Sequence, residues 1–198
     1  MTKIKMCGLS RHEDIEYANK IKPDFIGFVF AEKSKRFVSS EKTEELVKNL
    51  ESGIIPVGVF VNADISTVCS ILERGIIKMV QLHGNEDNDY IHSLKTFTDK
   101  PVIQAFRIKT KEDILNANNS CADFVLLDSG YGSGELFNHD FISGIERPFF
   151  LAGGLTPENV RESVEKYNPY AVDASSYLET DGVKDFKKML AFARAVKE

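Results

Sequence analysis

The sequence predicts an α/β fold in which eight βα units close into a single (βα)8 barrel, also called a TIM barrel. Three observations favour this fold over an open sheet. Short apolar runs recur eight times at the spacing of one βα unit. The runs are apolar on both faces, as the strands of a parallel sheet are. The first strand-to-helix turn, Cys7-Gly8-Leu9-Ser10, lacks the G-x-G-x-x-G pattern that is common in doubly wound sheets.

The eight predicted strands are spread evenly from one end of the chain to the other. They are Lys3–Met6, Phe25–Phe30, Ile55–Val61, Met79–Leu82, Val102–Phe106, Phe124–Leu127, Phe149–Leu151 and Ala171–Val172. A chain of 198 residues is near the small end for an eight-unit barrel, so its loops must be short. We therefore expect residues 1–198 to form one barrel-shaped catalytic domain.

Segments between and after these strands place apolar residues three and four positions apart, which is the spacing of one helix face. These residues are Ile65, Val68, Ile71 and Leu72; Tyr90, Ile91, Leu94 and Phe97; Val160, Val164 and Tyr167; and Val183, Phe186, Leu190 and Ala193. Thr156-Pro157-Glu158 is a favourable helix start, with a hydroxyl cap, a proline and an acid. The sixth βα unit is expected to be short, because only residues 141–145 could form a helix after a Gly-rich segment.

Composition and charge narrow the class of protein. The formal net charge is −5 and the 25 Lys and Arg residues are scattered, so neither nucleic acid nor a membrane surface is expected as a partner. No apolar run approaches the length of a membrane helix, and the N-terminal residues do not resemble a secretion signal. The three cysteines have no C-x-x-C spacing, which predicts a cytoplasmic protein with reduced thiols and no zinc site. Cys69 and Cys121 are interpreted as packing residues.

Residues capable of chemistry gather where the predicted strands end. In a (βα)8 barrel the carboxyl ends of the strands carry the active site. The residues just past the eight strands are Cys7 and Gly8; residues 32–36; Asn62; His83 and Gly84; Arg107; Asp128; Gly153 and Gly154; and Asp173, Ser175 and Ser176. We therefore expect these side chains to surround one site.

The same strand ends carry the motifs of one enzyme family. In chain order they are Lys5-Met6-Cys7-Gly8-Leu9, Gly27-Phe28-Val29-Phe30, Ser34-Lys35-Arg36, Val57-Gly58-Val59-Phe60-Val61-Asn62, Gln81-Leu82-His83-Gly84, Leu126-Leu127-Asp128, Gly153-Gly154-Leu155 and Val172-Asp173-Ala174-Ser175-Ser176. Over essentially the whole chain they resemble the phosphoribosylanthranilate isomerases of tryptophan biosynthesis. The resemblance implies an aldose–ketose isomerisation, the Amadori rearrangement of N-(5-phosphoribosyl)anthranilate to 1-(2-carboxyphenylamino)-1-deoxyribulose 5-phosphate. It implies a small phosphosugar as the ligand and no metal or organic cofactor, and it leaves monomer and homodimer both open.

The resemblance assigns the two proton transfers to Cys7 and Asp128. Asp128 is the expected general acid, which protonates the ribose ring oxygen, and Cys7 is the expected general base, which removes the C2′ proton. A carboxyl can donate only if its site keeps it protonated for part of the cycle, and a thiol acts as a base only as thiolate. Arg36 is expected to bind the anthranilate carboxylate, although the loop of residues 32–36 could also be merely solvated.

The expected phosphate site comprises Gly153 and Gly154 after the seventh strand and Ser175 and Ser176 after the eighth. Backbone N–H groups hold phosphate at these places in such barrels, and glycine allows a close approach. The Gly-Gly pair could instead mark only a tight turn. By the resemblance Asp173 and His83 are also substrate-binding residues, although His83 could serve only to order the fourth loop.

Two rival functions remain open at this point. A histidine-pathway isomerase barrel acts on a doubly phosphorylated substrate and is expected to use two aspartates, whereas this chain has Cys7 at the end of its first strand. Its second phosphate site would fall at residues 59–64 and 81–87, which offer no Gly-Gly pair, Lys or Arg. The other rival is a catalytically silent phosphate-binding barrel, which would need neither Cys7 nor Asp128.

Loops six and eight depart from the family pattern. Glu135 and Asn138 lie in a segment where the family has a Gly-rich stretch with Lys and then Phe-Asp-Trp. Tyr177 stands where glycine is common after the paired serines. These differences leave the geometry of both loops open and do not change Cys7 or Asp128.

Overall fold

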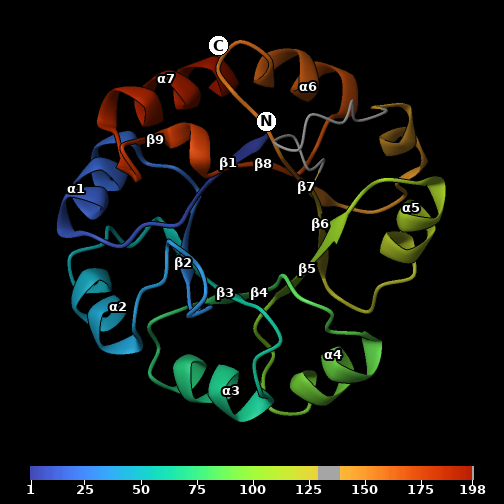
Figure 1. The fold of residues 1–198 in the computed structure, drawn as a ribbon, viewed down its shortest axis with the longest axis horizontal. Helices are drawn as coiled ribbons and strands as arrows, with labels where there is room; N and C mark the ends of the chain where they lie inside the picture. Colours follow the sequence, from blue (N-terminus) through green and yellow to red (C-terminus); the bar gives the residue numbers. More distant parts are fainter. Residues whose placement is uncertain (129–138, 198) are drawn as a thin grey trace.

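The computed structural model describes residues 1–128 and 139–197, and in it eight parallel strands form a closed barrel. The strands are β1 (Lys3–Cys7), β2 (Phe25–Val29), β3 (Ile55–Phe60), β4 (Met79–Leu82), β5 (Val102–Arg107), β6 (Phe124–Asp128), β7 (Phe149–Ala152) and β8 (Ala171–Ala174). Each strand pairs with the next, and the pairing of Lys5 with Asp173 between β1 and β8 closes the ring, which Figure 1 shows end-on. The predicted (βα)8 barrel is therefore confirmed.

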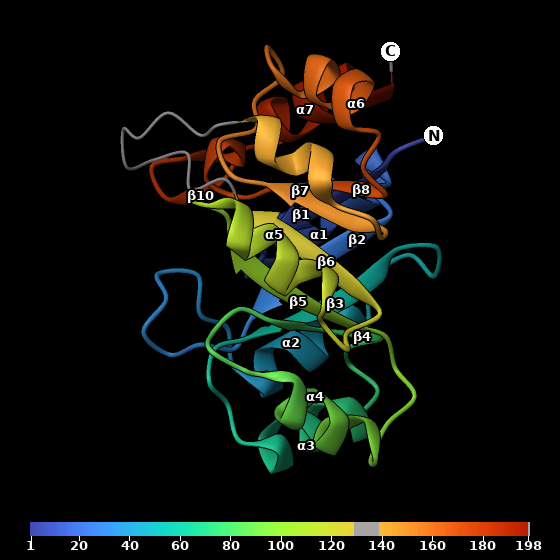
Figure 2. The same ribbon diagram turned by 90° about the vertical axis from the view of Figure 1, so that its right-hand side faces the viewer.

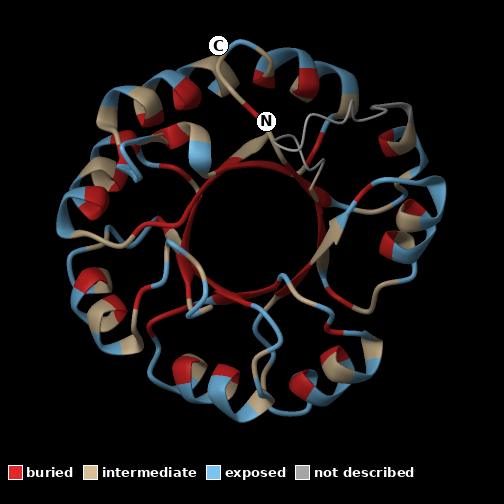
Figure 3. Ribbon diagram, in the orientation of Figure 1, coloured by how far each residue is buried: buried red, intermediate tan, exposed pale blue. Residues whose placement is uncertain are grey.

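The helices surround the barrel and pack against the outer faces of its strands (Figures 1 and 2). They are α1 (His12–Ile21), α2 (Ser40–Val47), α3 (Ile65–Glu73), α4 (Asn88–Lys95), α5 (Lys111–Asn118), the 3-10 helix η1 (His139–Gly144), α6 (Val160–Tyr167), the 3-10 helix η2 (Ser176–Leu178) and α7 (Phe186–Lys197). Figure 3 shows their buried residues on the side toward the barrel and their exposed residues outside. Within the described ranges, no helix is long and apolar enough to span a membrane.

The sixth βα unit is short, as its sequence predicts, because η1 takes the place of a full α-helix. Three details of the predicted helices are wrong. Phe97 lies beyond the end of α4 and is 71% exposed. Val183 belongs to a two-stranded hairpin of β9 (Glu179–Thr180) and β10 (Val183–Lys184), which precedes α7.

The third difference concerns the start of α6, which begins at Val160 rather than near Pro157. The Asn159 side chain accepts a hydrogen bond from the Thr156 N–H at 2.8 Å and donates to the Gly154 carbonyl at 3.0 Å. These two bonds hold residues 156–159 in a turn, so the helix starts only after Asn159. The turn also fixes the position of Gly154, which follows the carboxyl end of β7.

Side chains along each strand point alternately out toward the helices and into the barrel, so the outer core is separate from the barrel interior. Residues such as Ile4, Met6 and Phe28 face the helices and belong to the largest apolar cluster. A smaller cluster that includes Phe25 and Phe150 fills the barrel at the amino ends of the strands. The floor of the barrel is therefore closed, and a cavity can form only at the carboxyl ends of the strands.

Candidate active site

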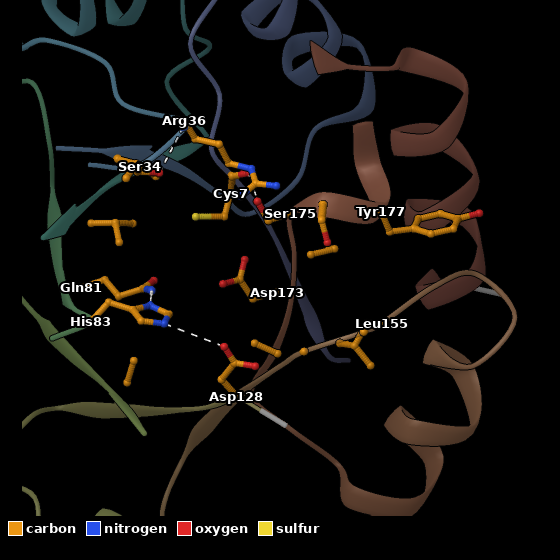
Figure 4. A pocket seen from close by; sticks show the side chains of 18 of the residues that line it. Cys7, Ser34, Arg36, Gln81, His83, Asp128, Leu155, Asp173, Ser175 and Tyr177 are labelled. Atoms are coloured by element: carbon orange, nitrogen blue, oxygen red, sulfur yellow. Dashed lines mark hydrogen bonds and ion pairs between the residues drawn. The ribbon is translucent and has the colours of Figure 1, made fainter. Parts of the chain in front are cut away.

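The carboxyl ends of the strands surround one cavity of about 1070 Å³ (Figure 4). The nine residues to which the sequence assigns a catalytic or substrate-binding role all line it: Cys7, Arg36, His83, Asp128, Gly153, Gly154, Asp173, Ser175 and Ser176. Of the other strand-end residues, Ser34, Gly84 and Arg107 also line the cavity, whereas Gly8, Asn62 and residues 32, 33 and 35 do not, so the expectation for these is wrong. The parallel barrel brings them together because every strand delivers its last residues to the same edge. In Figure 4, Cys7 and Asp128 point into the same space and the Asp173 carboxylate lies between them.

Cys7 is the last residue of β1, and its side chain faces the interior of the barrel beside Val29 and Val59. It is only 8% exposed, and this exposed part borders the cavity. The neighbouring position on β2 must be small, since a Cβ on Gly27 would lie 2.6 Å from the Cys7 sulfur. Gly27 thus leaves the space that the thiol occupies.

A buried ion pair lies directly below the thiol. Lys5 is fully buried, and its Nζ donates a hydrogen bond to Asp173 Oδ2 at 2.8 Å. Lys5 and Cys7 are two residues apart on one strand, so both face inward. Burial alone would lower the pKa of Lys5, but its interactions with Asp173 and with Cys7 raise this pKa above its ordinary value. Lys5 therefore stays an ammonium group in the barrel interior.

The same surroundings act in opposite directions on Cys7. Burial raises the pKa of the Cys7 thiol above its ordinary value, and the positive charges of Lys5 and Lys184 limit the rise. A thiolate requires positive charge nearby, and these two lysines supply it. Their charges lower the pKa of Cys7 by less than burial raises it. In the ligand-free protein Cys7 is accordingly a thiol near neutral pH.

Asp173 carries one carboxylate oxygen without a partner in the described part of the chain. Its Oδ2 accepts from Lys5, whereas its buried Oδ1 has no hydrogen bond. Burial raises the pKa of this carboxyl, partly offset by Lys5 and reinforced by Asp128. Asp173 lines the cavity, and this buried Oδ1 is the part of its carboxylate that the protein leaves without a hydrogen bond.

Asp128 ends β6, and it has His83 from the end of β4 as a neighbour. His83 Nε2 lies 3.9 Å from Asp128 Oδ2. The other ring nitrogen, Nδ1, lies 2.9 Å from Gln81 Nε2, so an amide N–H donates to it and the proton of the neutral ring sits on Nε2. Figure 4 shows this chain from Gln81 through His83 to Asp128 along one side of the cavity. The imidazole N–H is thereby directed at the Asp128 carboxyl.

Arg36 lies in the loop after β2 and lines the cavity, as predicted, with 32% of its side chain exposed. Its guanidinium is bound by Glu179, which the sequence does not place near it. The aliphatic part of Arg36 packs on Gly8, where a Cβ would lie 2.4 Å from Arg36 Cδ. Gly8 also has a φ of +83°, a conformation that favours glycine.

The predicted phosphate-binding residues form a patch of backbone donors. Gly153 and Gly154 have φ angles of +92° and +63°, so the chain turns sharply after β7. Within residues 1–128 and 139–197, the backbone N–H groups of Gly154, Ser175 and Ser176 have no recorded hydrogen-bond partner. The Ser175 hydroxyl is engaged, since it donates to the Cys7 carbonyl at 3.0 Å. The patch therefore links the ends of β7 and β8 to the strand that carries Cys7.

Two of the departures from the family pattern, Glu135 and Asn138, lie outside the described residues. The third, Tyr177, belongs to η2, and its ring packs partly buried against the main core cluster. Tyr177 does not have a positive φ, so its position does not require glycine. In the described ranges, no group of three or more His, Cys, Asp or Glu side chains is arranged to hold a metal ion.

Four residues of the site were not identified from the sequence: Lys5, Gln81, Glu179 and Lys184. A signal existed for Lys5, because a lysine inside an apolar strand, two residues before Cys7, must face the barrel interior with it. Gln81 is likewise an inward residue of β4. No local signal marks Glu179 or Lys184, whose burial depends on the hairpin folding over the end of β8.

Known proteins resemble this chain along its whole length. The family model of N-(5′-phosphoribosyl)anthranilate (PRA) isomerase matches residues 4–195. The isomerase of that name from Thermoanaerobacter sp. (strain X514) is 45% identical over 204 residues, covering all of this chain and 98% of the relative. The one from Endomicrobium trichonymphae is 46% identical over 195 residues, covering 96% of each chain.

Solved structures agree with these relatives. The phosphoribosyl anthranilate isomerase from Thermotoga maritima superposes with a TM-score of 0.87 at 31% identity, over all of this chain and 99% of the other. A second isomerase structure, 30% identical with a TM-score of 0.85, covers all of this chain and 99% of the other. That structure is a complex with reduced 1-(o-carboxyphenylamino)-1-deoxyribulose 5-phosphate. Both likenesses extend over the whole of this chain.

Proposed function

This chain belongs to the N-(5′-phosphoribosyl)anthranilate isomerase family, and we propose that Cys7 and Asp128 carry out its isomerisation. The family reaction is the aldose–ketose rearrangement of N-(5-phosphoribosyl)anthranilate in tryptophan biosynthesis. The observation that carries the assignment of roles is the meeting of a thiol and a carboxyl on one cavity. Around them lie an arginine and, among the described residues, the unpaired backbone N–H groups of Gly154, Ser175 and Ser176, which suit the carboxylate and the phosphate of this substrate.

Asp128 begins the reaction as the general acid. Its carboxyl donates a proton to the ribose ring oxygen, the bond from that oxygen to C1′ breaks, and the anthranilate nitrogen, which keeps its hydrogen, supplies the electron pair that forms a protonated imine. The His83 N–H directed at Asp128 orients the carboxyl and stabilises the carboxylate that the transfer leaves behind. Gln81 fixes the ring in the tautomer that this role requires.

Cys7 completes the proton transfers as the general base. Its thiolate removes the C2′ proton, which gives an enolamine that tautomerises to the ketone. Lys5 and Lys184 lower the free-energy cost of forming the thiolate in a buried place, because both act on it electrostatically. The Asp173 carboxylate, which lies between the two groups, accepts a hydrogen bond from a sugar hydroxyl and orients C2′ toward Cys7.

The substrate carries a single phosphate in this proposal. A second phosphate, half a barrel away, would have to bind at the ends of β3 and β4. There the Glu86 carboxylate already accepts hydrogen bonds from the N–H groups of Asn62 at 2.6 Å and Gly84 at 2.8 Å. A dianion at this place would meet a buried carboxylate and find these donors occupied. The arrangement disfavours the doubly phosphorylated substrate of the histidine pathway.

Complementation tests the function as a whole. Expression of this chain should restore growth without tryptophan to a bacterial strain that lacks the isomerase, and the purified protein should convert N-(5-phosphoribosyl)anthranilate in vitro. A silent phosphate-binding barrel would bind inorganic phosphate but fail both tests. Conversion of only the doubly phosphorylated substrate would support the rival isomerase instead.

The phosphate patch predicts a charge-dependent effect at Gly154. We expect Gly154→Asp to raise KM about 5-fold to 1000-fold, because a carboxylate about 4 Å from the phosphate repels it by roughly 1–4 kcal/mol. Gly154→Asn is the matched control, since the amide has the same shape, tolerates the positive φ of this residue and carries no charge. Equal KM values for the two variants would show that the Gly153-Gly154 turn is only structural.

The raised pKa of Cys7 predicts slow, pH-dependent alkylation. Iodoacetamide reacts with thiolate only, so its rate of modification of Cys7 should still be rising at pH values where the rate with glutathione has levelled off. Digestion and mass spectrometry follow Cys7 separately from Cys69 and Cys121. The pH at which the alkylation rate of Cys7 reaches half its maximum should lie above the corresponding pH for glutathione in the same buffer. A value equal to or below that of glutathione would contradict the raised pKa of Cys7.

A further inference from the structure

The Arg36 guanidinium is held by one carboxylate, Glu179, from the opposite end of the chain. Arg36 Nε donates to Glu179 Oε1 at 2.6 Å, and Arg36 Nη2 donates to Glu179 Oε2 at 2.9 Å. This is a two-bond, side-on contact between residues 143 positions apart. The Glu179 side chain is 11% exposed, so water screens the contact only weakly.

A buried lysine holds Glu179 in turn. Lys184, whose side chain is 1% exposed, donates to Glu179 Oε1 at 2.6 Å and to the Ser175 carbonyl at 3.0 Å. Burial alone would raise the pKa of Glu179, but the hydrogen bonds from Arg36 and Lys184 lower it below its ordinary value. Glu179 is therefore an anion at neutral pH, and its position is fixed through Ser175 to the end of β8.

The contact leaves one edge of the guanidinium unused. An arginine has five N–H donors, and Glu179 takes one from Nε and one from Nη2. Within residues 1–128 and 139–197, Arg36 Nη1 makes no hydrogen bond. The Nη1 hydrogens and the second Nη2 hydrogen form the end of the fork, which can bind a carboxylate with two parallel hydrogen bonds. Arg36 lines the cavity, and 32% of its side chain is exposed.

The charges in this group do not cancel. Arg36 and Lys184 are cations and Glu179 is an anion, so the three side chains carry one net positive charge. Without Lys184, the negative charge of Glu179 would cancel the positive charge of Arg36, and the pair would attract a substrate anion only weakly. Lys184 restores the positive charge while Glu179 keeps the guanidinium in one orientation.

We propose that Glu179 is a positioning residue that fixes Arg36 so that its free edge receives the carboxylate on the aromatic ring of the substrate. Glu179 itself does not touch the substrate in this arrangement. The proposal rests on the proposed function, since it deepens the role of Arg36 there. It assigns selection for a carboxylated aromatic ring to the β9–β10 hairpin as well as to the Arg36 loop.

Two substrates separate positioning from a merely structural role. One is N-(5-phosphoribosyl)anthranilate, and the other is N-(5-phosphoribosyl)aniline, which lacks the ring carboxylate. In Glu179→Gln the side-on contact loses one accepting oxygen and its charge. We expect kcat/KM for the carboxylated substrate to fall about 10-fold through KM, as for a weakened charged hydrogen bond. The value for the aniline substrate should change less than about twofold.

Three further variants make the result decisive. Arg36→Lys keeps the positive charge but loses the fork, and it should reduce the preference for the carboxylated substrate at least as much as Glu179→Gln. Glu179→Asp keeps the charge and should recover part of the preference. Glu44→Gln removes a more exposed Glu–Arg pair away from the cavity, that of Glu44 in α2 with Arg74 after α3, and should leave both kcat/KM values unchanged.

The outcomes distinguish the proposal from its premise. If Arg36→Lys leaves the preference intact, the assignment of Arg36 in the proposed function is wrong. Glu179 has only a structural role if Arg36→Lys removes the preference and Glu179→Gln leaves it intact. The same conclusion follows if Glu179→Gln lowers kcat/KM equally for both substrates. Should Glu179→Gln misfold with Lys184 left unpaired, Glu179→Gln/Lys184→Met removes both buried charges, and the same loss of preference is expected from it.

Discussion

Cys7→Ala should fold normally and lose a factor of about 10²–10⁴ in kcat, the typical contribution of a positioned general base. The loss follows from the place of the thiol, which faces the cavity at the end of β1 and lies above the buried Lys5. Folding should persist because the thiol belongs to a small cluster with Val29 and Val59, apart from the main core. Turnover of the substrate and circular dichroism measure the two effects.

Two variants separate loss of the base from loss of packing. Cys7→Ser keeps the size of the side chain but replaces the thiol by a hydroxyl, which does not ionise in this pH range, so it should be as inactive as Cys7→Ala. Cys69→Ala removes a cysteine from α3, away from the cavity, and should retain full activity. If Cys7→Ala keeps more than about a tenth of the wild-type turnover, Cys7 is not the base.

Asp128→Asn should lower kcat by a similar factor of about 10²–10⁴, because the amide has nearly the same shape but cannot donate a proton to the ring oxygen. KM should change little, since the proposed contacts to the phosphate and the ring carboxylate remain in place. Steady-state kinetics with the natural substrate give both constants.

The control for Asp128→Asn is the same substitution at Asp99, an exposed residue outside the cavity, which should have no effect on either constant. A rise in KM with an unchanged kcat for Asp128→Asn would assign this residue to binding and leave the general acid unidentified. Wild-type kinetics for both variants would remove Asp128 from the mechanism.

Hydrophobic periodicity was sufficient to predict the fold. Parallel strands buried on both faces must be apolar, and helices between them need one apolar face, so both patterns are visible in the sequence. The nine strand-end residues that were assigned a role all line the cavity, whereas Gly8 and Asn62, which were expected there as well, do not. The errors lie where one local pattern competes with another. Val183 has helical spacing, but it pairs with Thr180 in the hairpin.

The sequence by itself determined the barrel, the edge on which the site lies and the residue types at that edge, because each depends on spacing along one strand. Only the tertiary structure decided what surrounds them. Asp173 meets Lys5 and Glu179 meets Arg36 because the barrel closes β8 onto β1, joining residues 168 and 143 positions apart. Burial and charge depend on such contacts, so the raised pKa of Cys7 and the orientation of Arg36 are properties of the closed barrel.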